Sequence, residues 1–262
     1  MSRGGTLLLS ILLAAASAVA AQTSSQTAPD SHPQAANEVS STINGGGISS
    51  IPDNPPEAIR KHQSFEYGPF VNGGFGLGNR DNFYFLSAGV EAGKILTPVF
   101  HAGIFSGQFQ YAANIMPLWQ AYTPAPHEQV AKCTDQNGDI VSCTLQYGGG
   151  TFYGVSLTPV ILRWNFLTRN RRIQPWFQGA GGLVYTTHKY PPNIQSTATI
   201  DGGTCVWNFE PQGGFGIHYF TRAKRSIDLG VNGVHISSAS LGDRNPGVNA
   251  SIQVQVGYTF WK

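Results

Sequence analysis

A histidine and a serine stand two residues apart near the end of the chain, at His235 and Ser237. A serine hydroxyl is a poor nucleophile at neutral pH unless a neighbouring base takes its proton, and an imidazole is such a base. On a β-strand, residues two apart share a face and lie about 6.6 Å apart along it, at ~3.3 Å per residue. Side chains span that gap, so the pair predicts nucleophilic hydrolysis by serine if a strand carries it.

The spacing alone is a weak signal, because His62 and Ser64 repeat it in a polar segment without an amphipathic strand. The second pair differs in position. It ends a window of alternating residues, on the apolar face, where a histidine facing lipid is costly unless it serves a function. The alternative interpretation of this pair is two polar residues at the rim of a bilayer.

The composition limits the kind of protein that carries this pair. Only 11% of the 262 residues are charged, against roughly a quarter in an ordinary soluble domain, which disfavours a conventional soluble enzyme. The formal net charge is +2 and the basic residues form no long run, so the sequence predicts no nucleic-acid partner.

Alternation of apolar with small or polar residues predicts an all-β protein. Most of the alternating windows exceed ten residues, and they match the ~9 to 11 tilted residues with which a strand crosses a bilayer. The eight windows are approximately 65–78, 82–95, 99–115, 151–165, 173–187, 204–220, 226–237 and 249–261.

The two faces of the last windows differ sharply in polarity. One face of the final window is apolar and carries Ala250, Ile252, Val254, Val256, Tyr258 and Phe260. The other face carries Gln, Asn, Ser and Gly rather than the Lys and Glu expected outside a soluble lipocalin-like barrel. We therefore expect an eight-stranded antiparallel up-and-down transmembrane β-barrel, with polar side chains filling its interior and the apolar face toward lipid. Tyr258, Phe260 and Trp261 fit an aromatic girdle at the interface.

Connection lengths fit the same architecture. Long connections, about 116–150, 188–203 and 238–248, alternate with short ones near 96–98, 168–172 and 221–225, as outer loops and inner turns do in such barrels. The inner turns hold two basic clusters, which we interpret as solvated: Arg169, Arg171 and Arg172, and Arg222, Lys224 and Arg225. Arg80, Lys189 and Arg244, on outer connections, are either solvated or placed to meet phosphates.

The N-terminal part predicts export. Arg3 precedes a short apolar run and small residues, so we expect a signal peptide at 1–21. Residues 22–64 are rich in Ser, Thr, Gln, Asn, Gly and Pro and predict a disordered tail, with at most one helical turn at 56–62. The barrel is expected at 65–262, in the outer membrane of a bacterium.

Three cysteines accompany this export signal. Cys133 and Cys143 lie in the longest outer loop and Cys205 opens the sixth window, so three pairings are possible. The simplest disulfide joins Cys133 to Cys143. No second cysteine or histidine stands at ligand spacing beside any of them, which disfavours a metal site.

A family resemblance covers approximately residues 233–260. The run His235-Ile236-Ser237-Ser238-Ala239, followed by Asn245-Pro246-Gly247-Val248-Asn249 and a last amphipathic strand, resembles the C-terminal signature of the PagL-type lipid A 3-O-deacylases. The resemblance implies an eight-stranded outer-membrane barrel that hydrolyses the ester-linked acyl chain at position 3 of lipid A. Its substrate partner is lipopolysaccharide, and it implies no cofactor.

The resemblance also implies roles for individual residues. Ser237 corresponds to the nucleophile, His235 to its general base and Asn249 to the position of the catalytic acid. Backbone N–H groups after Ser237, at Ser238 and Ala239, correspond to an oxyanion hole. The family pattern has asparagine where this chain has Ser238 and glutamate where it has Asn249. An amide orients a histidine but does not stabilise the imidazolium as a carboxylate does, which makes Asp243 an alternative acid.

Other functions remain open on the sequence alone. The main alternative is a non-catalytic small outer-membrane barrel of a structural or adhesion type. A narrow pore is disfavoured, because eight strands leave an interior filled by side chains. The oligomeric state is not predicted.

Overall fold

The computed structural model describes residues 54–125, 127–147, 149–191, 205–239 and 249–262. The predicted signal peptide lies outside these residues, as does the predicted tail up to residue 53. The described residues belong to one compact unit. Among the described residues, no helix is long and apolar enough to cross a membrane.

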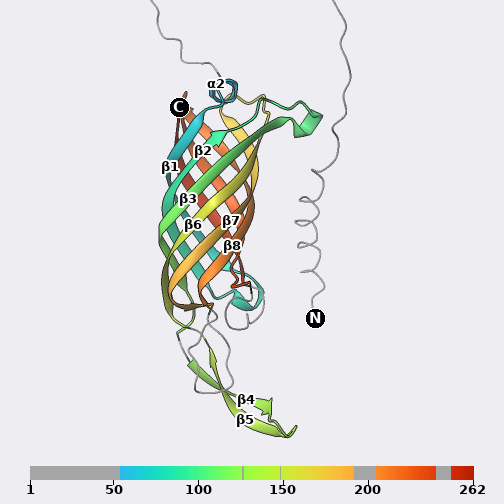
Figure 1. The fold of residues 1–262 in the computed structure, drawn as a ribbon, viewed down its shortest axis with the longest axis vertical. Helices are drawn as coiled ribbons and strands as arrows, with labels where there is room; N and C mark the ends of the chain where they lie inside the picture. Colours follow the sequence, from blue (N-terminus) through green and yellow to red (C-terminus); the bar gives the residue numbers. More distant parts are fainter. Residues whose placement is uncertain (1–53, 126, 148, 192–204, 240–248) are drawn as a thin grey trace, which may run out of the picture. The chain divides into compact units, whose positions relative to one another are not determined.

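Eight antiparallel strands close into a barrel in the order β1-β10-β9-β8-β7-β6-β3-β2, which confirms the predicted fold class (Figure 1). The strands are β1 (Phe65–Gly76), β2 (Tyr84–Ile95), β3 (Gly107–Tyr122), β6 (Thr151–Phe166), β7 (Ile173–Tyr190), β8 (Cys205–Arg222), β9 (Arg225–His235) and β10 (Ala250–Trp261). Because β1 pairs with β10, the sheet has no free edge, which satisfies every strand without water.

The remaining elements are short. Helix α2 (Pro55–Lys61) lies within the segment expected to be a tail, where one helical turn was predicted. The 3-10 helices η1 (Gly78–Arg80) and η2 (Gly103–Phe105) lie in connections. Strands β4 (His127–Thr134) and β5 (Ile140–Tyr147) form a separate two-stranded sheet within the long connection, which the sequence analysis did not predict.

The third strand differs from its prediction at both ends. The window 99–115 was expected, but β3 begins at Gly107, after η2, and continues to Tyr122. The pairing register with β6 shifts between Met116 and Trp119, around Pro117. Proline has no N–H to donate to a strand ladder, and a bulge accommodates it without ending the strand. The sequence analysis therefore ended this strand too early, because proline usually interrupts a strand and Pro117 does not.

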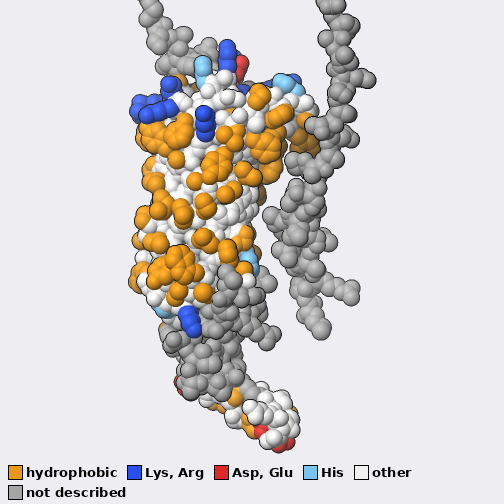
Figure 2. Space-filling view, in the orientation of Figure 1, with side chains coloured by type: hydrophobic (Ala, Val, Ile, Leu, Met, Phe, Trp, Pro, Cys, Tyr) orange, Lys and Arg blue, Asp and Glu red, His pale blue; other side chains and the backbone are white. Residues whose placement is uncertain are grey.

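The barrel wall has the predicted sidedness. Outward side chains such as Leu229 (43% exposed), Val254 (51%) and Phe215 (66%) form an apolar exterior, seen as the orange surface of Figure 2. Their inward neighbours are polar and buried, for example Asn232 and Gln253. A surface of this kind is stable against lipid rather than water.

The barrel has two rims, which we name by what they carry. The terminal rim is where β1 begins and β10 ends, and the loop rim is the opposite one, where β9 ends at His235. An apolar cluster fills the interior toward each rim. The cluster toward the terminal rim consists of Ile59, Ile95, Phe220 and Trp261. The cluster toward the loop rim consists of Phe83, Phe85, Trp119, Ala121, Phe152, Val184, Tyr190, Val234 and Ile236.

Trp261 corrects one prediction. It was expected in an outer aromatic girdle, but it is 2% exposed and its Nε1 donates to Ser226 Oγ at 3.0 Å. Its neighbours Tyr258 and Phe260 do lie on the outward side, and Phe260 stacks on Tyr67 with the ring centroids 5.5 Å apart. The strict alternation of β10 sends residue 261 inward.

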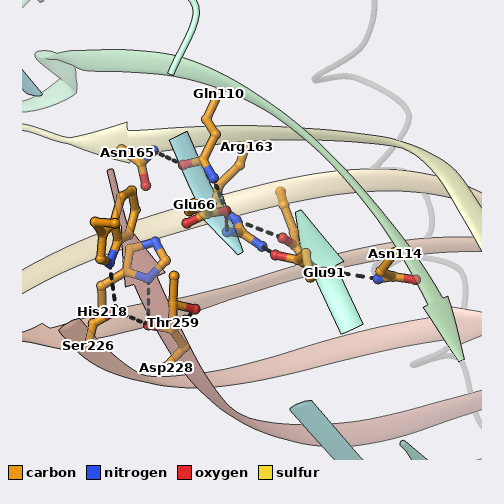
Figure 3. Close-up of polar contacts among 12 residues, drawn as sticks. Glu66, Glu91, Gln110, Asn114, Arg163, Asn165, His218, Ser226, Asp228 and Thr259 are labelled. Atoms are coloured by element: carbon orange, nitrogen blue, oxygen red, sulfur yellow. Dashed lines mark hydrogen bonds and ion pairs between the residues drawn. The ribbon is translucent and has the colours of Figure 1, made fainter. Parts of the chain in front are cut away.

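Between the two apolar clusters, the interior holds a polar network (Figure 3). Arg163 pairs with Glu66 at 3.0 Å and with Glu91 at 2.6 Å, and its Nε donates to Gln178 at 3.0 Å. These side chains come from four different strands. Charges buried this deeply require partners, so the network holds the wall together from inside.

Candidate active site at the loop rim

The candidate histidine and serine lie where β9 ends at the loop rim. His235 is the last residue of β9 and pairs with Ala250 of β10. The chain stays in the sheet for two further residues. Ile236 N–H donates to the Asn249 carbonyl at 2.9 Å, and Ser237 exchanges two backbone hydrogen bonds with Phe209 of β8, at 2.7 and 3.0 Å. The segment is therefore held on both sides, although the strand itself has ended.

Alternation places the two candidate side chains on the outer wall. Ile236 and Ser238 are each 1% exposed and point into the barrel, and Ile236 belongs to the apolar cluster near this rim. His235 and Ser237 are half-buried and share the outward parity of Leu229. Burial of Ile236 fixes the register, because a slip by one residue would turn every side chain to the opposite face.

Ser237 is followed by a sharp turn. Its Oγ accepts a hydrogen bond from the Ala239 N–H at 3.2 Å, and Ala239 has a φ of +48°. A left-handed conformation costs a non-glycine residue energy, and such residues are found at functional sites more often than elsewhere. The turn aims the Ala239 N–H at the serine hydroxyl.

Asn249 contacts the histidine differently from what the sequence suggested. The resemblance placed the side chain of residue 249 beside His235, whereas simple alternation placed it inside the barrel. The structure has it 6% exposed, next to the inward Ser251, and it is the backbone of Asn249 that hydrogen-bonds the His235 side chain. The local pairing of Asn249 with Ile236 brings that backbone to the imidazole.

The other predicted members of the site are placed as follows. The Ser238 hydroxyl points inward, and it is buried without a hydrogen-bond partner among the described residues, so it does not lie beside the Ser237 hydroxyl. Asp243 lies outside the described residues. The Ala239 N–H donates to Ser237 Oγ, and its role in an oxyanion hole stays a prediction.

The wall beside the pair is apolar. Phe209 (40% exposed) and Trp207 (59%) lie on the neighbouring strand β8, and Gly233 of β9 is exposed on the outward side. A hydrophobic ester chain lying along this wall would reach the serine without leaving the apolar surface. The site is thus suited to a substrate that is itself in the membrane.

Arg80 is a feature that sequence reasoning misjudged as solvated or phosphate-facing. It is 7% exposed, and its guanidinium carbon lies 4.9 Å from the centre of the Phe83 ring. Burial lowers the pKa of Arg80 from its ordinary value. The turn that carries it is joined to β10, because Leu77 N–H donates to the Ala250 carbonyl at 2.8 Å. Arg80 therefore helps to build the loop rim next to the site.

A second histidine with an acidic partner lies in the barrel interior, near the terminal rim (Figure 3). His218 Nδ1 lies 2.7 Å from Asp228 Oδ1, which also accepts from Ser226 Oγ at 2.8 Å. His218 is completely buried, so no lipid substrate reaches it through the wall. The pairing of β8 with β9 places residues 218 and 228 opposite each other, which the sequence alone did not reveal.

The cysteines are consistent with a structural role. Cys143 is disulfide-bonded and Cys205 is a free thiol. The side chain of Cys133 lies outside the description, so its pairing with Cys143 stays a prediction. Within the described part of the chain, no three metal-ligating side chains gather in one place.

Comparison with known proteins gave matches to one family model and to solved structures. The family model described as lipid A 3-O-deacylase (PagL) matches residues 134–259, a range that contains the whole candidate site. A solved structure, "Crystal structure of the outer membrane enzyme PagL", aligns with a TM-score of 0.41 and 14% identity, covering 73% of this chain and 98% of that one. A search of curated proteins found no match.

Proposed function

Over residues 134–259 this chain is related to the PagL family of lipid A 3-O-deacylases, and from that relationship we propose that it is a serine esterase of the outer membrane. The substrate is lipid A, and the bond that it hydrolyses is the ester linking the acyl chain at position 3. Ser237 is the nucleophile and His235 its general base. The family and the barrel fold together point to an outer-membrane protein.

One observation carries the proposal. His235 and Ser237 are the outward residues at the very end of β9, on a wall whose exposed side chains are apolar, while Ile236 and Ser238 between and after them are buried inside. If the loop rim is the outer one, as the long connections indicate, this wall meets the outer leaflet. Esters of lipid A lie at that depth, and a soluble ester would not be met there.

The chemistry needs two half-reactions. Ser237 Oγ attacks the ester carbonyl carbon while His235 accepts the hydroxyl proton. The tetrahedral intermediate collapses, the bond from carbon to the sugar oxygen breaks, and His235 returns the proton to that oxygen. Water then repeats the sequence on the acyl-serine, with His235 taking its proton, and releases the fatty acid.

Backbone groups supply the remaining functions. The Ser237 N–H is committed to the Phe209 carbonyl, so the oxyanion donors are sought at the N–H groups of Ser238 and Ala239. The Ala239 N–H already lies 3.2 Å from Ser237 Oγ, close to where the negative charge develops. The backbone of Asn249 orients His235, a task that a carboxylate performs in the Ser-His-Asp triad.

The test is the lipid A of cells that express the chain. We expect mass spectrometry to show loss of one position-3 acyl group with the unmodified protein and intact lipid A with Ser237→Ala. Ser64→Ala is the matched control, because Ser64 has a histidine at the same spacing but lies at the opposite rim. Ser64→Ala should deacylate as the unmodified protein does.

One outcome would reject the esterase, and a second would reject Ser237 as its nucleophile. If correctly inserted, unmodified protein leaves lipid A unchanged, the non-catalytic barrel is the better interpretation. If Ser237→Ala still removes the acyl group, the nucleophile is a different residue. Loss of a chain other than that at position 3 would retain the esterase and correct its specificity.

A further inference from the structure

Exposed basic side chains gather along the terminal rim, where they appear in blue at one end of the barrel (Figure 2). The sequence analysis interpreted the turn residues among them as separate solvated clusters. The structure joins them into one surface, which we call the basic arc. Its members are Lys94, Arg172, Arg222, Lys224, Arg225 and Lys262, all of them exposed.

Backbone contacts make the arc continuous on one side of the rim. The Arg172 carbonyl accepts from the Phe220 N–H at 2.7 Å, which joins the β6–β7 turn to the end of β8. Arg222 and Arg225 are paired across the β8–β9 turn.

The other half of the arc is connected in the same way. The Lys224 carbonyl accepts from the Trp261 N–H at 3.0 Å, and the next residue, Lys262, exchanges backbone hydrogen bonds with Phe65 at 2.8 and 3.0 Å. Phe65 in turn pairs with Lys94. Charges from six neighbouring strands and turns therefore follow one another around the rim.

Acidic side chains do not neutralise the arc. Among the described residues of this rim, Glu57 of α2 is the exposed acid. The nearby carboxylates of Glu66 and Asp228 are 2% and 8% exposed and take part in the interior network. On the described exterior of the terminal rim, exposed cations therefore outnumber exposed acidic side chains, an imbalance that attracts anions.

The arc adjoins the apolar exterior of the barrel. The Arg225 guanidinium lies 5.7 Å from the centre of the Phe260 ring, and Lys262 Nζ lies 5.5 Å from that of Tyr67. Tyr67 is 39% exposed on the apolar wall. Cations above outward aromatic rings stand at the level where hydrocarbon meets headgroups.

We propose that the basic arc binds the phosphate headgroups of anionic phospholipids in the inner leaflet of the same membrane. The apolar wall continues directly into the arc, which commits the ligand to a lipid of that leaflet rather than to a soluble anion. The proposal rests on the barrel standing in a membrane with its terminal rim inward. It does not depend on the esterase, and deacylation is measured separately.

Tryptophan quenching in vesicles tests the arc. Trp164 packs against Phe100 and Phe109 near this rim, with the rings of Phe109 and Trp164 4.7 Å apart. In Trp207→Phe protein, which lacks the exposed tryptophan near the loop rim, we compare quenching by brominated phosphatidylglycerol and brominated phosphatidylcholine. We expect a preference for phosphatidylglycerol of about five-fold or more at low salt, as each surface cation near an anionic leaflet contributes on the order of five-fold.

Variants then assign the preference to the arc. The triple substitution R222Q/K224Q/R225Q should reduce the preference to about one-fold to two-fold. The matched triple R222K/K224R/R225K keeps the charge and should retain the preference. Raising the salt concentration should weaken the preference of the unmodified protein, a measurement that needs no variant.

Three results would overturn the proposal. These are equal quenching by the two lipids with the unmodified arc, a preference that does not change with salt, and full preference in the folded glutamine variant. Inorganic polyphosphate bound by the protein without any discrimination between the two lipids would assign the arc to a soluble anion instead.

Discussion

At the scale of single residues, His235 and Asn249 contribute to the candidate site in different ways, although the sequence pattern suggested that both act through their side chains. His235 faces outward beside Ser237, whereas the side chain of Asn249 is buried on the inward side and its backbone hydrogen-bonds the imidazole. In the proposed mechanism the base is indispensable. Asn249, at the position of the family's catalytic acid, acts through its backbone, which a side-chain substitution does not remove.

This separation predicts unequal effects of two substitutions. His235→Ala removes the general base, and we expect the rate of lipid A deacylation to fall by about 10²-fold to 10⁴-fold. Asn249→Ala keeps the backbone contact, and we expect a fall of less than about ten-fold, measured on purified protein with lipid A in detergent. A loss in Asn249→Ala as large as that in His235→Ala would show that the amide itself takes part.

At the scale of elements, the end of β9 positions the pair through the residue between them. Ile236 is 1% exposed and packs in the apolar cluster toward the loop rim. Its burial and the backbone bonds to Phe209 and Asn249 hold residues 235–237 as an extension of the sheet. The positions of His235 and Ser237 on the outer wall thus depend on the packing of Ile236 inside the barrel.

A substitution inside the barrel should therefore affect chemistry outside it. Ile236→Ala leaves a cavity in the cluster, and we expect the free energy of unfolding to fall by about 2–4 kcal/mol, with deacylation reduced as well. Urea titration of the protein in vesicles measures the first effect. Ile227→Ala is the control, since Ile227 lies on the outward face of β9, and it should leave deacylation unchanged. Equal effects of the two substitutions would contradict the anchoring role.

Alternation predicted well which side chains of each strand point inward and which point outward. A period of two distinguishes inward from outward residues wherever a strand is uninterrupted, as in β9 and β10. It failed near Pro117, where a bulge carries β3 onward. It agrees with the inward position of Trp261, which the sequence analysis assigned to the outer girdle from its aromatic type instead. Strand ends are decided by pairing partners, which a local pattern does not contain.

At the scale of the whole molecule, an ion-pair network lies in the barrel interior between two apolar clusters. Arg163 from β6 binds Glu66 of β1 and Glu91 of β2, and it is itself completely enclosed (Figure 3). The Arg163 guanidinium lies 4.8 Å from the centre of the Trp176 ring, which leaves no side of the cation facing open space. Buried ion pairs and apolar clusters therefore fill much of the described interior of the barrel.

Removing the shared cation should destabilise the barrel strongly. Arg163→Met leaves two carboxylates without their partner in the interior, and we expect a loss of about 3–5 kcal/mol in the free energy of unfolding. Arg169→Met, at an exposed turn, is the matched control and should change it by less than about 0.5 kcal/mol. Urea denaturation in vesicles measures both, and equal midpoints for the two variants would contradict the role of the network.

The sequence by itself determined the architecture and the outward position of the candidate pair, His235 and Ser237. Alternation over long windows needs only local information, because each residue of a strand has one of two faces, and the difference in polarity shows which face meets lipid. The same parity placed His235 and Ser237 on the apolar wall before any strand pairing was known.

Only the tertiary structure decided which groups meet across strands. The backbone contact of Asn249 with His235, the burial of Arg80 and the joining of separate basic turns into one arc depend on the register of β8, β9 and β10. Register is set by side chains far apart in sequence that pack in one interior, such as Arg163 with Glu66. A linear pattern contains no distance between such residues, so their contacts had to be seen in the folded barrel.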